Sequence, residues 1–168
     1  MNDFKKFEGI NYATDFVKKI NSVQQLVFKN LKQFIVDDCN IIDIGGGPGV
    51  GAKLVDNYGI KANVLNLEPS ANVLEVPDFE HVKYQAQQIT FTESINTTLP
   101  VKADVVLMVS AAHEIALSYK GSNMENKKSF FRELKSFLKK HANKDAVFCI
   151  GFPNYKPDVS DEEVKQQR

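Results

Sequence analysis

Residues 40–51 decide the fold of this chain, and they read Asn40-Ile41-Ile42-Asp43-Ile44-Gly45-Gly46-Gly47-Pro48-Gly49-Val50-Gly51. The apolar, β-branched run over residues 40–44 predicts a buried strand. Four glycines within residues 45–49 then end the strand and predict a turn whose backbone can approach a ligand without Cβ clashes. The helix expected over residues 52–58 would point the free N–H groups of its first turn at the same ligand.

Strands and helices alternate on either side of this stretch. Further strands are predicted at residues 62–67, 82–84, 103–109 and 145–150, and helices at 111–119 and 124–141. The last helix carries one apolar face, made of Phe130, Phe131, Leu134, Phe137 and Leu138. Helical periodicity also covers residues 12–36, as one helix or as two with a break near Asn21. The rhythm predicts an α/β fold, a doubly wound, mostly parallel sheet of about five strands with helices on both faces and additional N-terminal helices.

Such a sheet binds ligands beyond the carboxyl ends of its strands, so the glycine turn is the candidate site. Gly47, Gly49 and Ala52 fit the dinucleotide fingerprint G-x-G-x-x-G/A, although this frame begins two residues late for a turn that follows the strand directly. A phosphate-binding P-loop is excluded because no Gly-Lys-Ser/Thr follows. A nicotinamide dinucleotide therefore stays among the candidate ligands.

Residues 41–49 resemble the first motif of the class I, Rossmann-like S-adenosylmethionine-dependent methyltransferases, which is an acidic residue, an apolar residue and then G-x-G-x-G. The resemblance covers about residues 40–152. It implies that the backbone of Gly45, Gly46, Gly47 and Gly49 wraps the amino-acid end of S-adenosylmethionine. It also implies that Asp43 orients either this loop or the amino group of the ligand.

The second strand ends at Glu68, 25 residues after Asp43, where the family's second motif places an acid. A carboxylate at this position can accept hydrogen bonds from both ribose hydroxyls of the cofactor. Folds that bind NAD also carry an acid here, so Glu68 by itself does not separate the two cofactors.

Two further segments complete the expected site. After the third strand, Gln87 or Gln88 stands where the family often has Asp near adenine, and an amide can both donate to and accept from a base edge. The segment after the fourth strand, from Ser110 to Glu114, resembles the family's fourth motif in small-molecule methyltransferases. Ser110 is expected to contact the cofactor. His113 is either a general base facing the substrate or a structural residue at a helix start.

The resemblance divides the chain into an N-terminal helical segment, residues 1–38, and a Rossmann-like domain, residues 39–168. The family's sheet has seven strands, and only five are predicted here. We therefore expect a truncated or degenerate domain, or an open sheet edge that a partner or a second copy of the chain covers.

Composition limits the partners and the location. Lys plus Arg and Asp plus Glu balance at 21 each, so no nucleic acid is expected. No apolar stretch reaches 18 residues, so no membrane is expected. The two cysteines, Cys39 and Cys149, have no metal-ligand spacing, which predicts buried reduced thiols, no metal site and a cytoplasmic protein.

The predicted function is methyl transfer from S-adenosylmethionine to a small-molecule O, N, S or C nucleophile. The alternatives are a non-catalytic S-adenosylmethionine-binding or interaction module and, more remotely, an NAD-dependent oxidoreductase.

Overall fold

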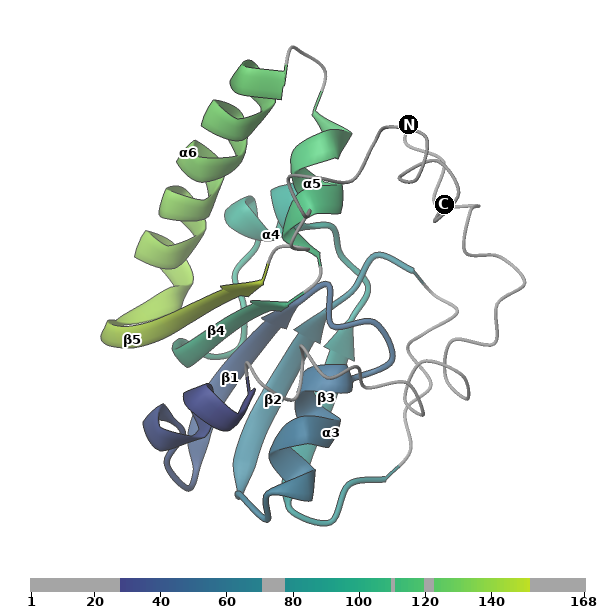
Figure 1. The fold of residues 1–168 in the computed structure, drawn as a ribbon, viewed down its shortest axis with the longest axis vertical. Helices are drawn as coiled ribbons and strands as arrows, with labels where there is room; N and C mark the ends of the chain where they lie inside the picture. Colours follow the sequence, from purple (N-terminus) through teal and green to yellow (C-terminus); the bar gives the residue numbers. More distant parts are fainter. Residues whose placement is uncertain (1–27, 71–77, 110, 120–122, 152–168) are drawn as a thin grey trace, which may run out of the picture.

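The computed structural model describes residues 28–70, 78–109, 111–119 and 123–151. Five strands form one sheet in the order β3-β2-β1-β4-β5, and every pairing is parallel. The predicted parallel α/β fold is therefore confirmed (Figure 1). The strands are β1 (Cys39–Ile44), β2 (Ala62–Leu67), β3 (Val82–Gln87), β4 (Ala103–Val109) and β5 (Ala142–Gly151). The helices are η3 (Lys32–Phe34), α3 (Val50–Asn57), α4 (Phe91–Asn96), α5 (Ala112–Ser118) and α6 (Asn123–His141).

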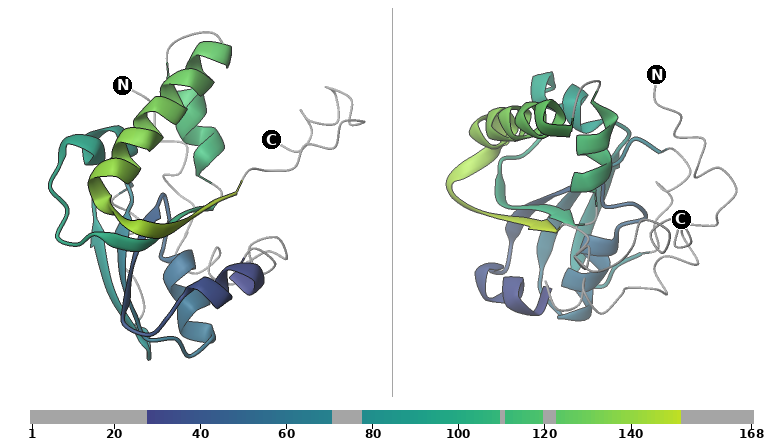
Figure 2. Two further views of the ribbon diagram at one scale, coloured as in Figure 1. Left: turned by 90° about the vertical axis from the view of Figure 1, so that its left-hand side faces the viewer. Right: turned by 45° about the horizontal axis from the view of Figure 1, so that its top comes forward.

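Helices cover both faces of the sheet (Figure 2). On one face, Phe28, Leu31 and Ile35, in the segment before β1, pack with α3 against the alternate residues of the strands. On the other face, α4, α5 and α6 pack against the remaining strand residues. The two apolar clusters bury both sides of β1 and β4, which explains why these strands read as continuous apolar runs.

Most predicted elements lie within two residues of their observed bounds. The bounds of two strands and the placement of one side chain need correction, and one helix was missed. Strand β3 extends to Gln87 and does not end at Tyr84, and β5 begins at Ala142 and not at Asp145. Helix α4 was not predicted. Phe131 is 54% exposed, because consecutive residues of a helix point about 100° apart and Phe130 takes the inward position.

Two expectations fall partly or wholly outside the described residues, and a third is confirmed only in part. The N-terminal helical segment is described only from residue 28, where residues 28–31 are helical. The residues after β5 are not described, so the partner expected on an open edge stays a prediction. Both cysteines are free thiols, but only Cys39 is buried, and Cys149 is half-buried.

Candidate functional site

The carboxyl ends of β1, β2 and β4 lie at one edge of the sheet (Figure 1). From β1 the chain adds β2 and β3 on one side, and it then crosses to add β4 and β5 on the other side of β1. The strand order therefore reverses between β1 and β4. The turn after β1 packs against the start of the segment after β4, because a Cβ added to Gly45 would overlap the Cβ of Ala111. The glycine turn thus lies at the topological switch point, where parallel α/β sheets bind their ligands.

The turn depends on glycine at alternate positions. Gly45, Gly47 and Gly49 have φ angles of 66°, 54° and 84°, a left-handed region that other residues rarely adopt. Gly49 is the N-cap of α3. A Cβ added to Gly47 would meet no described atom within 4 Å. The turn is therefore packed against protein at Gly45 and Gly46 and open at Gly47, which is the side from which a ligand can approach.

Asp43 lies beneath the turn. Its side chain is buried, and a Cβ added to either Gly46 or Gly51 would overlap its Oδ2 atom. The backbone N–H of Gly51 donates a hydrogen bond to this carboxylate. Burial raises the pKa of Asp43 to about 7, the negative charge of Glu68 adds to the rise, and the Gly51 hydrogen bond opposes it. These contacts give Asp43 a role in holding the loop, which is one of the two roles that the sequence left open.

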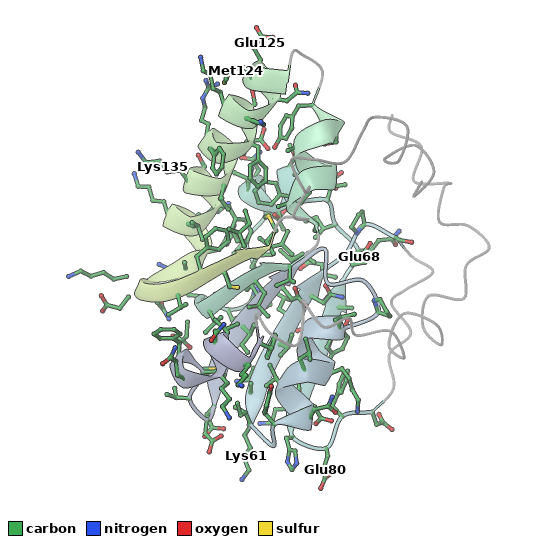
Figure 3. All side chains as sticks on the ribbon, viewed as in Figure 1. Lys61, Glu68, Glu80, Met124, Glu125 and Lys135 are labelled. Carbon is green, nitrogen blue, oxygen red and sulfur yellow. The ribbon has the colours of Figure 1, made fainter. Side chains whose placement is uncertain are left out.

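Glu68 lies directly against the glycine turn. Its Oε2 accepts from the Gly47 N–H at 3.0 Å and its Oε1 accepts from the Ser70 N–H at 3.0 Å. The side chain is buried, and Figure 3 shows it at the end of the sheet opposite Lys61 and Glu80. The carboxylate expected to hold a ribose is thus adjacent to the backbone expected to hold the rest of the ligand.

The sequence analysis missed two site residues, Asn66 and Tyr84. Asn66 is fully buried in β2, where it is paired with Asp43, and its side chain bonds the turn and Tyr84 of β3. The signal was available, because Asn66 interrupts an apolar strand two positions before Glu68, and alternate residues of a strand share a face. A buried amide is costly unless it is hydrogen-bonded, so an Asn in a buried strand indicates a built polar contact.

The remaining predicted residues are placed less fully. Gln87 is the last residue of β3 and not part of a following loop, and its carbonyl accepts from the Glu68 N–H at 3.1 Å. Gln88 donates from Nε2 to the carbonyl of Pro69 at 3.4 Å. His113 lies in the first turn of α5, but its side chain is not among those described, and Ser110 lies outside the described residues. The expected contacts of these four residues with a ligand therefore stay predictions.

Within the described residues, no group of three or more His, Cys, Asp or Glu side chains could hold a metal ion. No helix in the same part of the chain is long and apolar enough to span a membrane.

Solved structures share this fold at low sequence identity. A protein from Pyrococcus horikoshii OT3 matches with a TM-score of 0.51 and 15% identity over 86% of this chain and 63% of its own. A chain from the complex between the Haloferax volcanii Trm112 methyltransferase activator and a protein assigned as a methyltransferase matches with a TM-score of 0.51 and 13% identity, over 82% of this chain and 56% of that one. The chain therefore shares the parallel α/β fold of these solved structures.

A third similar structure is an S-adenosylmethionine-dependent methyltransferase from Thiobacillus denitrificans in complex with S-adenosylhomocysteine. It matches with a TM-score of 0.48 and 14% identity over 84% of this chain and 53% of its own. The chain spans between 53% and 63% of the length of these three structures. No family model and no curated protein matches the sequence.

Proposed function

We propose that this chain binds S-adenosylmethionine in the crevice between the glycine turn and Glu68, and that it transfers the methyl group to a small-molecule O, N, S or C nucleophile. The observation that carries the proposal is the contact between the Gly47 N–H and the Glu68 carboxylate at 3.0 Å. It brings a backbone that a nucleoside ligand can approach together with an acid suited to its ribose hydroxyls. The methyltransferase fold of the chain supports the choice of this ligand.

The residues present fit the cofactor in three ways. The left-handed turn leaves Gly47 open to a ligand. The Gly47 N–H donates to Oε2 of Glu68, which places a carboxylate, a group suited to accept from ribose hydroxyls, directly against the turn. Asp43 and the contact with Ala111 keep the turn in place. Bound S-adenosylmethionine would supply an electrophilic methyl group on its sulfonium sulfur.

The chain's own residues would act mainly by positioning. Holding a nucleophile in line with the methyl group removes most of the entropic cost of the encounter. His113 lies in the first turn of the helix after β4, at the same end of the sheet as the crevice, and is our candidate to accept a proton from the nucleophile or to orient it. Ser110, Gln87 and Gln88 are proposed as further cofactor contacts.

Titration calorimetry on the full chain tests the binding step. We expect S-adenosylhomocysteine to bind and NADH not to bind. Glu68→Ala should weaken binding at least tenfold, roughly the loss of one or two hydrogen bonds to a charged acceptor. The control is Glu80→Ala, because Glu80 is 83% exposed and lies at the opposite end of the sheet (Figure 3). Tight binding of NADH without binding of S-adenosylhomocysteine would overturn the proposal in favour of an oxidoreductase.

Turnover separates an enzyme from a binding module. With S-adenosylmethionine labelled at the methyl group and a panel of small nucleophiles, we expect label to appear on one substrate class. His113→Ala should lower the rate while leaving the affinity for S-adenosylhomocysteine unchanged. Cofactor binding without label transfer to any compound of the panel would instead support the non-catalytic module.

A further inference from the structure

Asn66 bonds the glycine turn through both ends of its side-chain amide. Its Oδ1 accepts from the Gly46 N–H at 3.1 Å, and its Nδ2 donates to the Gly47 carbonyl at 2.8 Å. The same Nδ2 donates its second hydrogen to the hydroxyl of Tyr84 at 2.8 Å. Both donors of the amide and its acceptor are therefore in use at a position with no solvent exposure.

Only one orientation of this amide satisfies the turn. The backbone N–H of Gly46 can only donate and the carbonyl of Gly47 can only accept, so exchanging Oδ1 and Nδ2 would place like groups against each other. A carboxylate or an apolar group could not make the same pair of contacts. The side chain thus fixes the relative position of these two backbone groups with a donor and an acceptor that an ionised carboxylate cannot provide together.

Tyr84 accepts the second hydrogen of Asn66 Nδ2. It lies in β3, packs partly buried against the core beside α3, and contacts the ring of Phe79 with centroids 5.5 Å apart. Burial raises the pKa of Tyr84 to about 12, with the charges of Asp43 and Glu68 adding to the rise and the Asn66 hydrogen bond opposing it. The hydroxyl consequently stays neutral in ordinary buffers and remains an acceptor for Nδ2.

The bonded groups adjoin the proposed cofactor contact. Gly47, whose carbonyl is held by Asn66, donates its own N–H to Oε2 of Glu68. A Cβ added to Gly46 would lie 2.7 Å from Oδ1 of Asn66, so the amide also fills the space beneath the turn. The backbone that would face the cofactor is therefore fixed from below by one side chain of β2 and one of β3.

We propose that Asn66 and Tyr84 are positioning residues that form a latch beneath the glycine turn and hold the Gly46–Gly47 backbone in the arrangement that binds the cofactor. The inference rests on the proposed function and adds to it two residues outside the glycine motif and its acidic partner. The latch orders the turn before the ligand binds, so less conformational entropy is lost on binding. A preorganised site therefore binds its ligand more tightly than one that must be ordered on binding.

Two variants test the latch by calorimetry with S-adenosylhomocysteine. Asn66→Asp keeps the shape of the side chain but sets an anionic oxygen against the Gly47 carbonyl, and we expect affinity to fall on the order of a hundredfold at pH 8. Tyr84→Phe removes only the hydroxyl, and the expected loss is roughly fivefold. Asn63→Asp is the matched control, because Asn63 lies near the other end of β2, where its side-chain amide donates to Oδ1 of Asn40 in β1.

The pH dependence distinguishes positioning from a general loss of stability. A protonated carboxyl regains one donor, so the affinity of Asn66→Asp should recover toward the wild-type value as the pH is lowered. The comparison is made at each pH with the wild type, because Asp43, Glu68 and Tyr84 face this side chain in both proteins. Hydrogen exchange at the Gly46 amide should also be faster in both variants, while amides in the middle of β1 keep their protection.

The outcomes separate the latch from the proposed function. If wild-type protein fails to bind S-adenosylhomocysteine, both proposals fall. If it binds, and Asn66→Asp binds equally well at pH 8, the latch alone is overturned. Should Asn66→Asp not fold, Tyr84→Phe decides, and wild-type affinity in that variant contradicts the latch.

Discussion

The buried carboxyl of Asp43 makes stability depend on pH, and Asp43→Asn exposes the effect. Burial raises the pKa of this group from 3.8 to about 7 in the folded protein. Between these two values the folded chain keeps a proton that the unfolded chain has released. The free energy of unfolding therefore falls as pH rises through this window, and the contribution of the protonated group is fully present only below about pH 4.

The size of the effect follows from the shift. The change from 3.8 to about 7 is about 3 pH units. Each unit corresponds to about 1.4 kcal/mol, so ionising Asp43 in place costs up to about 4 kcal/mol. Asp43→Asn keeps an oxygen for the Gly51 N–H but cannot ionise. We expect the variant to gain stability relative to wild type by as much as this amount as the pH is raised from about 4 to about 8.

Urea unfolding, followed by circular dichroism at several pH values, measures this difference. Asp145→Asn is the control, because Asp145 is exposed in β5 and removing an exposed charge changes stability little. Glu68→Gln provides a second check, since removing its charge should move the wild-type pH transition to lower pH. Parallel stability curves for wild type and Asp43→Asn across the whole range would refute this account of the buried carboxyl.

Other substitutions test the packing around the site and the helices. Gly46→Ala forces a methyl group onto Asp43 and should cost about 1–3 kcal/mol of unfolding free energy, measured by denaturant titration. Thr90→Ala removes the N-cap hydrogen bond of α4 and should cost about 1 kcal/mol by the same assay. Phe130→Ala should cost about 3–5 kcal/mol, whereas Phe131→Ala should change stability by less than about 0.5 kcal/mol. Equal losses in the two phenylalanine variants would contradict the placement of α6.

The sequence was most informative where burial is complete. Strands β2 and β4 have the bounds that their mostly apolar runs predicted, because both faces of a central parallel strand are covered and favour apolar residues. Strand β3 was cut short at Tyr84 because it forms an edge of the sheet. Its Gln85 is exposed and its Gln87 is only partly buried, so the strand lacks a continuous apolar pattern.

Helix α4 was missed because its six residues are too few to show helical periodicity. The capping box formed by Thr90 and Glu93 was the available signal, and it is present in the structure. Asn66 was missed for a different reason. Its role depends on a turn 20 residues earlier and on Tyr84 in another strand, and such contacts follow from strand register, which the sequence pattern does not specify.

A crystal structure of the chain grown with S-adenosylhomocysteine tests the central claim most directly. We predict electron density for the nucleoside over Gly47, with both ribose hydroxyls within hydrogen-bonding distance of the Glu68 carboxylate. Density for the ligand elsewhere would contradict the proposed binding site. A fully occupied ligand whose ribose does not contact Glu68 would contradict it as well.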